Sequence, residues 1–196
     1  MITLVNHITD AELPLSLVEH KVLEELKAQR PRYVNAMEFA ASKRLIVSEN
    51  YSSCQGVVFQ DEKFRKGAHA HNHHSSDPYY FLTGRSKHID TAISDPAKIF
   101  QDLKKVFAVH IYHTDFNEWS TECINTALTG IGMTGEKIVH IPIKSKIEGI
   151  VEYLSIAHDV QNGKVYVFPE DFDKGICFDL KEYITAKKHS HNNILP

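Results

Sequence analysis

The residues in this sequence that are best suited to nucleophilic or metal chemistry are one cysteine and a group of histidines. Cys54 lies in the apolar run Ser-Cys-Gln-Gly-Val-Val-Phe-Gln-Asp, and the histidines follow it at positions 69, 71, 73 and 74. A thiol becomes a nucleophile when a neighbouring histidine lowers its pKa and accepts its proton. Cys54 and His71 therefore predict thiol chemistry if the fold brings them together.

Two other interpretations of these residues compete with a thiol enzyme. Histidines two apart on a strand project from the same face, so His69, His71 and His73 can share one metal ion, as in a cupin-like site. The remaining ligands of such a site are not evident, and Asp77 is a weak substitute for a carboxylate ligand. A cysteine in an apolar strand is also most often core, because free cysteine is among the most buried residue types.

Two predicted strands position the cysteine and the histidine. Residues 53–61 are mostly apolar, the polar stretch 61–63 ends the run, and residues 66–73 resume a two-residue alternation. We expect an antiparallel hairpin with Cys54 and His71 on successive strands, 17 residues apart. Inward-facing side chains on paired strands can come within hydrogen-bond reach.

The rest of the chain mixes helical and strand patterns. Helical spacing is predicted over 15–29, over 89–107 with a break near Asp95 and Pro96, and over 117–128. Strands are predicted over 43–48, 108–112, 137–143, 149–157 and 164–168, and residues 171–196 form a weakly patterned tail. This order predicts an α+β fold, a single-domain layered sandwich of mostly antiparallel sheet with helices.

A glycine-rich segment matches the dinucleotide-binding fingerprint in letters only. Gly130, Gly132 and Gly135 have the required spacing, and Lys137 follows them. A helix precedes this segment and a strand follows it, so no helix N-terminus is available to hold a phosphate. A helix cap and a turn are the better interpretation.

Composition limits the partners and the compartment. The 196 residues suit one domain, and the net charge of -3 gives no general attraction to nucleic acid. We expect no membrane insertion, because no stretch approaches the roughly 18 apolar residues that span a bilayer. Three widely spaced cysteines and an N-terminus unlike a signal peptide favour a cytoplasmic protein, or one secreted as an effector without a cleaved signal.

The predicted hairpin resembles the active-site hairpin of CheD, the family of bacterial chemoreceptor glutamine deamidases. Ser53-Cys54 is similar to the end of the family's Gly-Ser-Cys, and Gly67-Ala-His-Ala-His71 to its closing Gly-Ala-x-Ala-His. Similarity in outline continues at 87–92, at Asn117 and at 163–167, so that the resemblance covers roughly residues 43–168. It divides the chain into an N-terminal helical extension (1–42), a CheD-like catalytic domain (43–170) and a C-terminal tail (171–196).

The resemblance implies a role for each matched residue. Cys54 is the nucleophile, His71 is the base, and Ser48 replaces a threonine that helps to orient the histidine in the family. Backbone N–H groups near Ser53 and Cys54 are the candidates for holding the oxyanion. The implied reaction converts a protein glutamine to glutamate without a cofactor.

Substrate and partners follow from the resemblance only in outline. The substrate is a protein that bears the glutamine, and a regulatory protein partner is possible because CheD also binds one. The deamidase domain of the cytotoxic necrotising factor toxins is more distantly similar and favours His69 as the base. A divergent or effector-type member, or an inactive CheD-like interaction module, are the alternatives that remain, since Asn50-Tyr-Ser52 replaces small family glycines.

Overall fold

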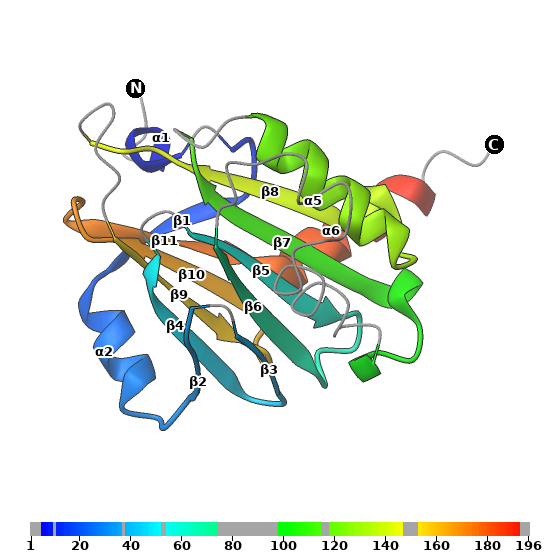
Figure 1. Ribbon diagram of the computed structural model, residues 1–196, viewed down its shortest axis with the longest axis horizontal. Coiled ribbons are helices and arrows are strands. Elements are labelled where there is room, and N and C mark those ends of the chain that lie inside the picture. Colours follow the sequence, from blue (N-terminus) through cyan, green and yellow to red (C-terminus); the bar gives the residue numbers. More distant parts are fainter. Residues whose placement is uncertain are drawn as a thin grey trace.

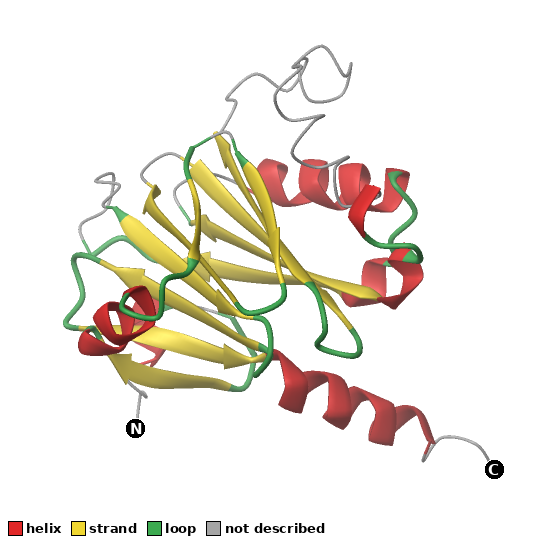
Figure 2. Cartoon of the chain, turned by 90° about the horizontal axis from the view of Figure 1, so that it is seen from below, coloured by secondary structure: helices red, strands yellow, loops and turns green. Residues whose placement is uncertain are grey.

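The computed structural model describes residues 5–9, 11–36, 38–51, 54–73, 98–114, 118–146 and 153–192. These residues form two sheets, one of six strands and one of five, with helices at their edges and on their outer faces (Figures 1 and 2). The expected α+β sandwich in one domain is confirmed.

The six-stranded sheet has the order β1-β11-β10-β9-β4-β2. Its pairs are antiparallel except that β2 runs parallel to β4. The strands are β1 (Leu15–Glu19), β11 (Lys174–Asp179), β10 (Lys164–Pro169), β9 (Leu154–Asp159), β4 (Leu45–Tyr51) and β2 (Arg32–Val34).

The five-stranded sheet has the order β3-β6-β5-β7-β8. It contains the predicted hairpin as β5 and β6, and only its β7–β8 pair is parallel. The strands are β3 (Phe39–Ser42), β6 (Gly67–His73), β5 (Cys54–Asp61), β7 (Val106–His113) and β8 (Ile138–Ile143).

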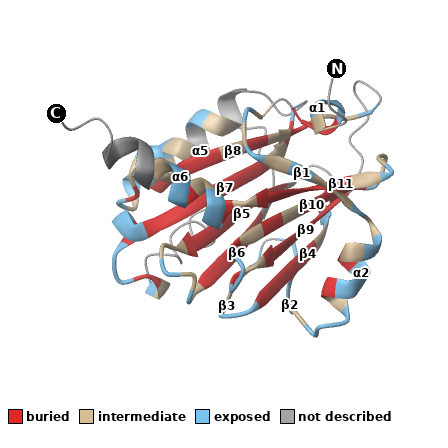
Figure 3. Cartoon of the chain, turned by 180° about the vertical axis from the view of Figure 1, so that it is seen from behind, coloured by how far each residue is buried: buried red, intermediate tan, exposed pale blue. Residues whose placement is uncertain are grey.

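The main core lies between the two sheets. It joins Val58 and Val109 of the five-stranded sheet to Ile156 and Val165 of the six-stranded sheet, all of them fully buried. Buried positions run along the strands of both sheets in Figure 3. Apolar residues at alternate strand positions meet across this interface, which is the reason for the layered architecture.

Helices lie at the edges and on the outer faces of the sheets, and two of them add Ile8 and Ile184 to the main core. The helices are α1 (Val5–Ile8), α2 (Lys21–Lys27), α5 (Glu118–Gly130) and α6 (Leu180–Asn192). Ile124 and Leu128 of α5 pack on the outer face of the five-stranded sheet, against Val57 and Ala108. No helix in the described part of the chain is long and apolar enough to cross a membrane.

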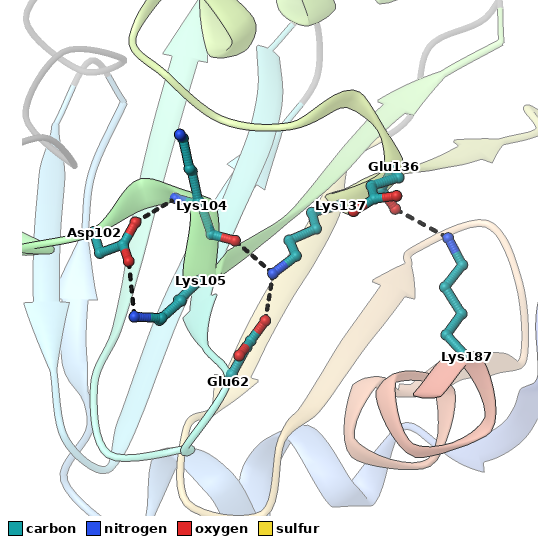
Figure 4. A network of polar contacts seen from close by, with 7 residues as sticks. All are labelled: Glu62, Asp102, Lys104, Lys105, Glu136, Lys137 and Lys187. Atoms are coloured by element: carbon teal, nitrogen blue, oxygen red, sulfur yellow. Dashed lines mark hydrogen bonds and ion pairs between the residues drawn. The ribbon is translucent and has the colours of Figure 1, made fainter. Parts of the chain in front are cut away.

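The glycine-rich segment forms a helix end and a turn, as expected. Gly132 has a φ of 101°, and the Met133 N–H closes the helix on the Leu128 carbonyl. A short 3₁₀ turn (Gly135–Lys137) then leads into β8. Figure 4 shows the Lys137 ammonium paired with the Glu62 carboxylate and bonded to the Lys104 carbonyl, so this lysine ties the turn after β5 to the start of β8.

Two sequence-based assignments were wrong. Residues 15–19 of the expected helix form β1, because they pair residue for residue with β11, and only Lys21–Lys27 are helical. The expected tail contributes β11, between β1 and β10, and the helix α6. Residues 1–42 therefore supply β1 and β2 to the six-stranded sheet and β3 to the five-stranded sheet, and residues 171–196 supply β11 to the six-stranded sheet.

The C-terminal part of the expected helix over 89–107 is not an α-helix in the structure. Residues 89–97 lie outside the described part of the chain, and a 3₁₀ turn (Leu103–Lys105) leads directly into β7 at Val106. The predicted strands 108–112, 137–143 and 164–168 and the helix 117–128 are confirmed within a few residues. Asn117 and residues 87–92 of the resemblance lie outside the described residues.

Candidate active site

Cys54 and His71 lie near the same end of the β5–β6 hairpin. Cys54 pairs with His73, and Gly56 pairs with His71. His71 is thus one diagonal step from Cys54, about 7 Å along the strand, a separation that long side chains can span. The structure describes the backbone of Cys54 but not its side chain, and Ser53 lies outside the described residues.

His71 is held by a hydrogen bond that crosses the space between the two sheets. Its Nδ1 lies 2.9 Å from the Ser48 Oγ on β4, and both residues are fully buried. The Ser48 hydroxyl donates its only hydrogen to the Val34 carbonyl at 2.6 Å. Ser48 must therefore accept a hydrogen bond from His71 Nδ1–H, and the lone pair of the neutral ring is on Nε2. This tautomer is the one that lets Nε2 act as a base.

A bulge in β4 brings two side chains to the same side of the strand. Ser48 pairs with Ile156, whereas Tyr51 pairs with Leu154, so β4 has one extra residue between them. In a regular strand without a bulge, residues three apart face opposite sides of the sheet. Asn50 takes up the irregularity with a φ of 64°, a conformation that asparagine adopts more readily than most residues. Ser48 and Tyr51 are consequently both buried between the sheets.

Tyr51 connects His69 and His71, the two histidines of β6 whose side chains the structure describes. Its ring stacks on His71 with centroids 3.7 Å apart and an interplanar angle of 15°. Its hydroxyl is hydrogen-bonded to His69 Nε2 at 2.6 Å. Burial first, and then the nearby His158 and His71, hold the pKa of His69 well below its usual value. His69 therefore stays neutral, with Nε2 engaged by Tyr51.

The strand register separates the two candidates for the base. His69 pairs with Val58, four residues from Cys54 and about 13 Å along the strand. That span exceeds one diagonal step, whereas His71 lies within it. The geometry of the hairpin favours His71 over His69.

Gly56 makes room for this arrangement. A Cβ added there lies 2.4 Å from Ile156 Cδ1 and 3.4 Å from the Tyr51 ring and hydroxyl. Gly56 also pairs directly with His71. Its missing side chain therefore lets Tyr51 and Ile156 pack beneath the histidine.

Replacing Gly56 with alanine should destabilise the protein, because the new methyl group overlaps Ile156 in a close-packed core. We expect a loss of about 1–3 kcal/mol in the free energy of unfolding, measured by urea denaturation. Gly130 is the matched control, since a Cβ there meets nothing within 4 Å. Equal stability of the Gly56→Ala and Gly130→Ala variants would contradict the tight packing.

Further buried polar residues lie near the site and were missed at the sequence level. His158 on β9 donates from Nε2 to the Gln60 Oε1 at 2.8 Å, because the Gln60 amide nitrogen already donates to Asp61 and Lys66. Burial lowers the pKa of His158 to about 3. Single polar residues inside apolar strands were the available signal, since such groups need a partner when buried.

A second polar cluster joins the outer face of the five-stranded sheet to α5. His110 Nδ1 lies 3.0 Å from His140 Nδ1, and these residues pair across β7 and β8. Gln55 bonds to His110 at 2.7 Å, and Asn125 of α5 bonds to His140 at 3.0 Å. Burial lowers the pKa of both histidines, so the cluster is neutral and holds β5, next to Cys54, against β7, β8 and α5.

The histidines of β6 have other partners than a shared metal ion. His69 and His71 are hydrogen-bonded to Tyr51 and Ser48, and the side chain of His73 lies outside the described part. Among the described residues, no three His, Cys, Asp or Glu side chains are arranged to hold a metal ion.

Comparisons with known proteins give little further information. No protein-family model matches the sequence, and no curated protein matches it significantly. Among solved structures, the hypothetical protein YfiH of Bacillus licheniformis is similar with a TM-score of 0.37 and 10% sequence identity. The match covers 71% of this chain and 60% of that structure's chain.

Proposed function

We propose that this protein is a cysteine-dependent protein-glutamine deamidase with Cys54 as nucleophile and His71 as base. The observation that carries the proposal is the Ser48–His71 hydrogen bond, since it fixes the ring with its lone pair on Nε2. The hairpin register supports the pairing, because His71 is one diagonal step from Cys54. The resemblance to the CheD family supplies the substrate class.

The proposed reaction has two halves. His71 Nε2 takes the thiol proton of Cys54, and the thiolate attacks the side-chain carbonyl carbon of a glutamine. The imidazolium then gives that proton to the departing nitrogen, ammonia leaves, and a thioester remains. His71 next takes a proton from water, the hydroxide attacks the thioester, and the returning proton restores the thiol as glutamate is released.

Two structural features suit this chemistry. Burial of His71 and its contact with Tyr51 keep the ring in one orientation, which reduces the reorganisation needed for proton transfer. In this proposal, backbone N–H groups near Ser53 and Cys54 stabilise the oxyanion. The substrate is a protein-borne glutamine, and the enzyme acts in the cytoplasm or as an effector exported without a cleaved signal.

Thiol reactivity tests the proposal without knowledge of the substrate. Iodoacetamide near neutral pH should modify Cys54 rapidly, because a histidine-paired cysteine is largely thiolate there. Cys177 is the internal control: it is buried, and burial raises the pKa of its thiol to about 11. Mass spectrometry of the two cysteine peptides gives their separate rates.

The outcome distinguishes an enzyme from an inactive interaction module. Selective modification of Cys54 in the folded protein, absent in Cys54→Ala, supports the nucleophile. Modification of Cys54 only after unfolding, at the rate of Cys177, would reject it.

A further inference from the structure

Three arginines line a cavity that shares no residue with the candidate active site. Arg30 follows α2, Arg32 begins β2, and Arg44 lies in the turn between β3 and β4. The cavity has a volume of about 350 Å³. Its other lining residues are mostly polar: Gln29, Pro31, Ser42, Leu45, Asp159, Gln161 and Asn162.

Backbone contacts bring these segments together. The parallel register of β2 and β4 pairs Arg32 with Ile46, so the starts of both strands are adjacent. The Val160 N–H donates to the Arg44 carbonyl at 2.7 Å, which ties the β9–β10 turn to the same place. The Arg44 N–H is capped by the Ser42 hydroxyl at 3.0 Å. The arginines are therefore fixed by strand pairing at one end of the sandwich.

The positive charge of the cavity is only partly offset within the described chain, because three arginines and one carboxylate line it. None of the three guanidinium groups has a hydrogen bond or an ion pair to a residue that the structure describes. The one carboxylate in the lining, Asp159, accepts hydrogen bonds from the Asn162 N–H at 3.1 Å and its side-chain amide at 2.7 Å. By contrast, Lys27, Lys105 and Lys137 each pair with a carboxylate.

Arg30 occupies an unfavourable backbone conformation. Its φ is 55°, two residues after Ala28, the C-cap of α2. A left-handed conformation is strained for a residue with a long side chain, and such strain concentrates at binding sites. The arginine at this position therefore adopts a backbone conformation that its residue type disfavours.

We propose that this cavity binds the phosphate group of a small phosphate monoester. Guanidinium groups present paired N–H donors that match phosphate oxygens, and three of them suit a dianion. The amides of Gln29 and Gln161 add neutral donors or acceptors for the rest of such a ligand. The volume is in the range of small-molecule sites. This inference does not depend on the chemistry of Cys54.

Calorimetric titration with phenyl phosphate and with inorganic phosphate, in a buffer free of other oxyanions, tests the site. We expect saturable binding of one phenyl phosphate per chain and weaker binding of inorganic phosphate. Arg44→Gln and Arg30→Gly should each raise the dissociation constant about tenfold or more, because each removes a charge-assisted contact. Glycine relieves the positive φ at position 30, so the melting temperature of Arg30→Gly should not fall.

Lys43→Gln is the matched control. It removes one positive charge from the same turn, but Lys43 does not line this cavity. Its dissociation constant should stay within about twofold of the wild-type value, since general charge effects on a surface are small. An absence of saturable binding to the wild-type protein, or an equal loss in Lys43→Gln and Arg44→Gln, would overturn the proposal.

Discussion

Replacing His71 with glutamine is expected to reduce deamidation by about 10³-fold or more, because glutamine cannot accept the proton of the Cys54 thiol. Ammonia release and the one-dalton mass gain of a glutamine-rich unfolded protein measure this loss. The Cys54→Ser variant sets the baseline without a thiol. Iodoacetamide modification of Cys54 at neutral pH should also slow in His71→Gln, a readout that needs no substrate.

Variants of Ser48 give a second test of the same mechanism, because Ser48 acts through His71. Ser48→Ala removes the acceptor of the Nδ1–H bond, so we expect a loss on the order of 10- to 100-fold. Ser48→Thr keeps the hydroxyl and should restore most of the rate. The pH profile of the alanine variant should change as well, because the histidine has lost the partner that fixes its tautomer. Full activity of His71→Gln, with His69 intact, would instead assign the base to His69.

Acid should destabilise the protein well before its carboxylates titrate. His69, His110 and His158 are fully buried, and burial is the main cause that lowers the pKa of each. An unfolded histidine has a pKa of about 6.5, so below that pH the unfolded chain binds more protons than the folded chain. Stability that is present above pH 6.5 is then lost as the pH falls.

The size of this effect follows from linkage. When the pH falls from 7.5 to 5.5, each histidine that remains neutral in the folded chain lowers the free energy of unfolding by about 1.4 kcal/mol. The three histidines together lower it by about 4 kcal/mol. For His158 the loss continues toward its folded pKa of about 3. Urea denaturation at the two pH values and constant ionic strength measures the difference.

His158→Gln is the control for this pH dependence. Glutamine can keep a donor for Gln60 but does not titrate, so the pH-dependent loss should shrink by about 1.4 kcal/mol whatever the stability at pH 7.5. An unchanged pH dependence in this variant would show that His158 is protonated in the folded protein or does not contribute.

Local patterns predicted the elements whose residues are close in sequence. The alternation over 66–73 and the polar turn at 61–63 predicted the β5–β6 hairpin, which has the expected strands and pairing. The helix over 117–128 and the strands over 108–112 and 164–168 followed in the same way. In each case, periodicity over a single turn or hairpin is enough to define the element.

Only part of the candidate site could be predicted from residues that are close in sequence. The hairpin makes Cys54 and His71 neighbours on adjacent strands, and this could be predicted from their spacing. The contact of His71 with Ser48 was implied only by the resemblance, because it joins residues on two different sheets. The role of Tyr51 was not predicted at all, since it depends on the bulge at Asn50.

The sequence by itself determined the α+β class, the hairpin and the candidate pair of Cys54 and His71. Only the tertiary structure decided that residues 15–19 are a strand, that β11 lies inside a sheet, and that Ser48 and Tyr51 both face His71. It also brought Arg44 to the same cavity as Arg30 and Arg32. The physical reason is that periodicity reports which side of an element is apolar, whereas long-range strand pairing and one extra residue in β4 decide which elements meet and which side chains face each other.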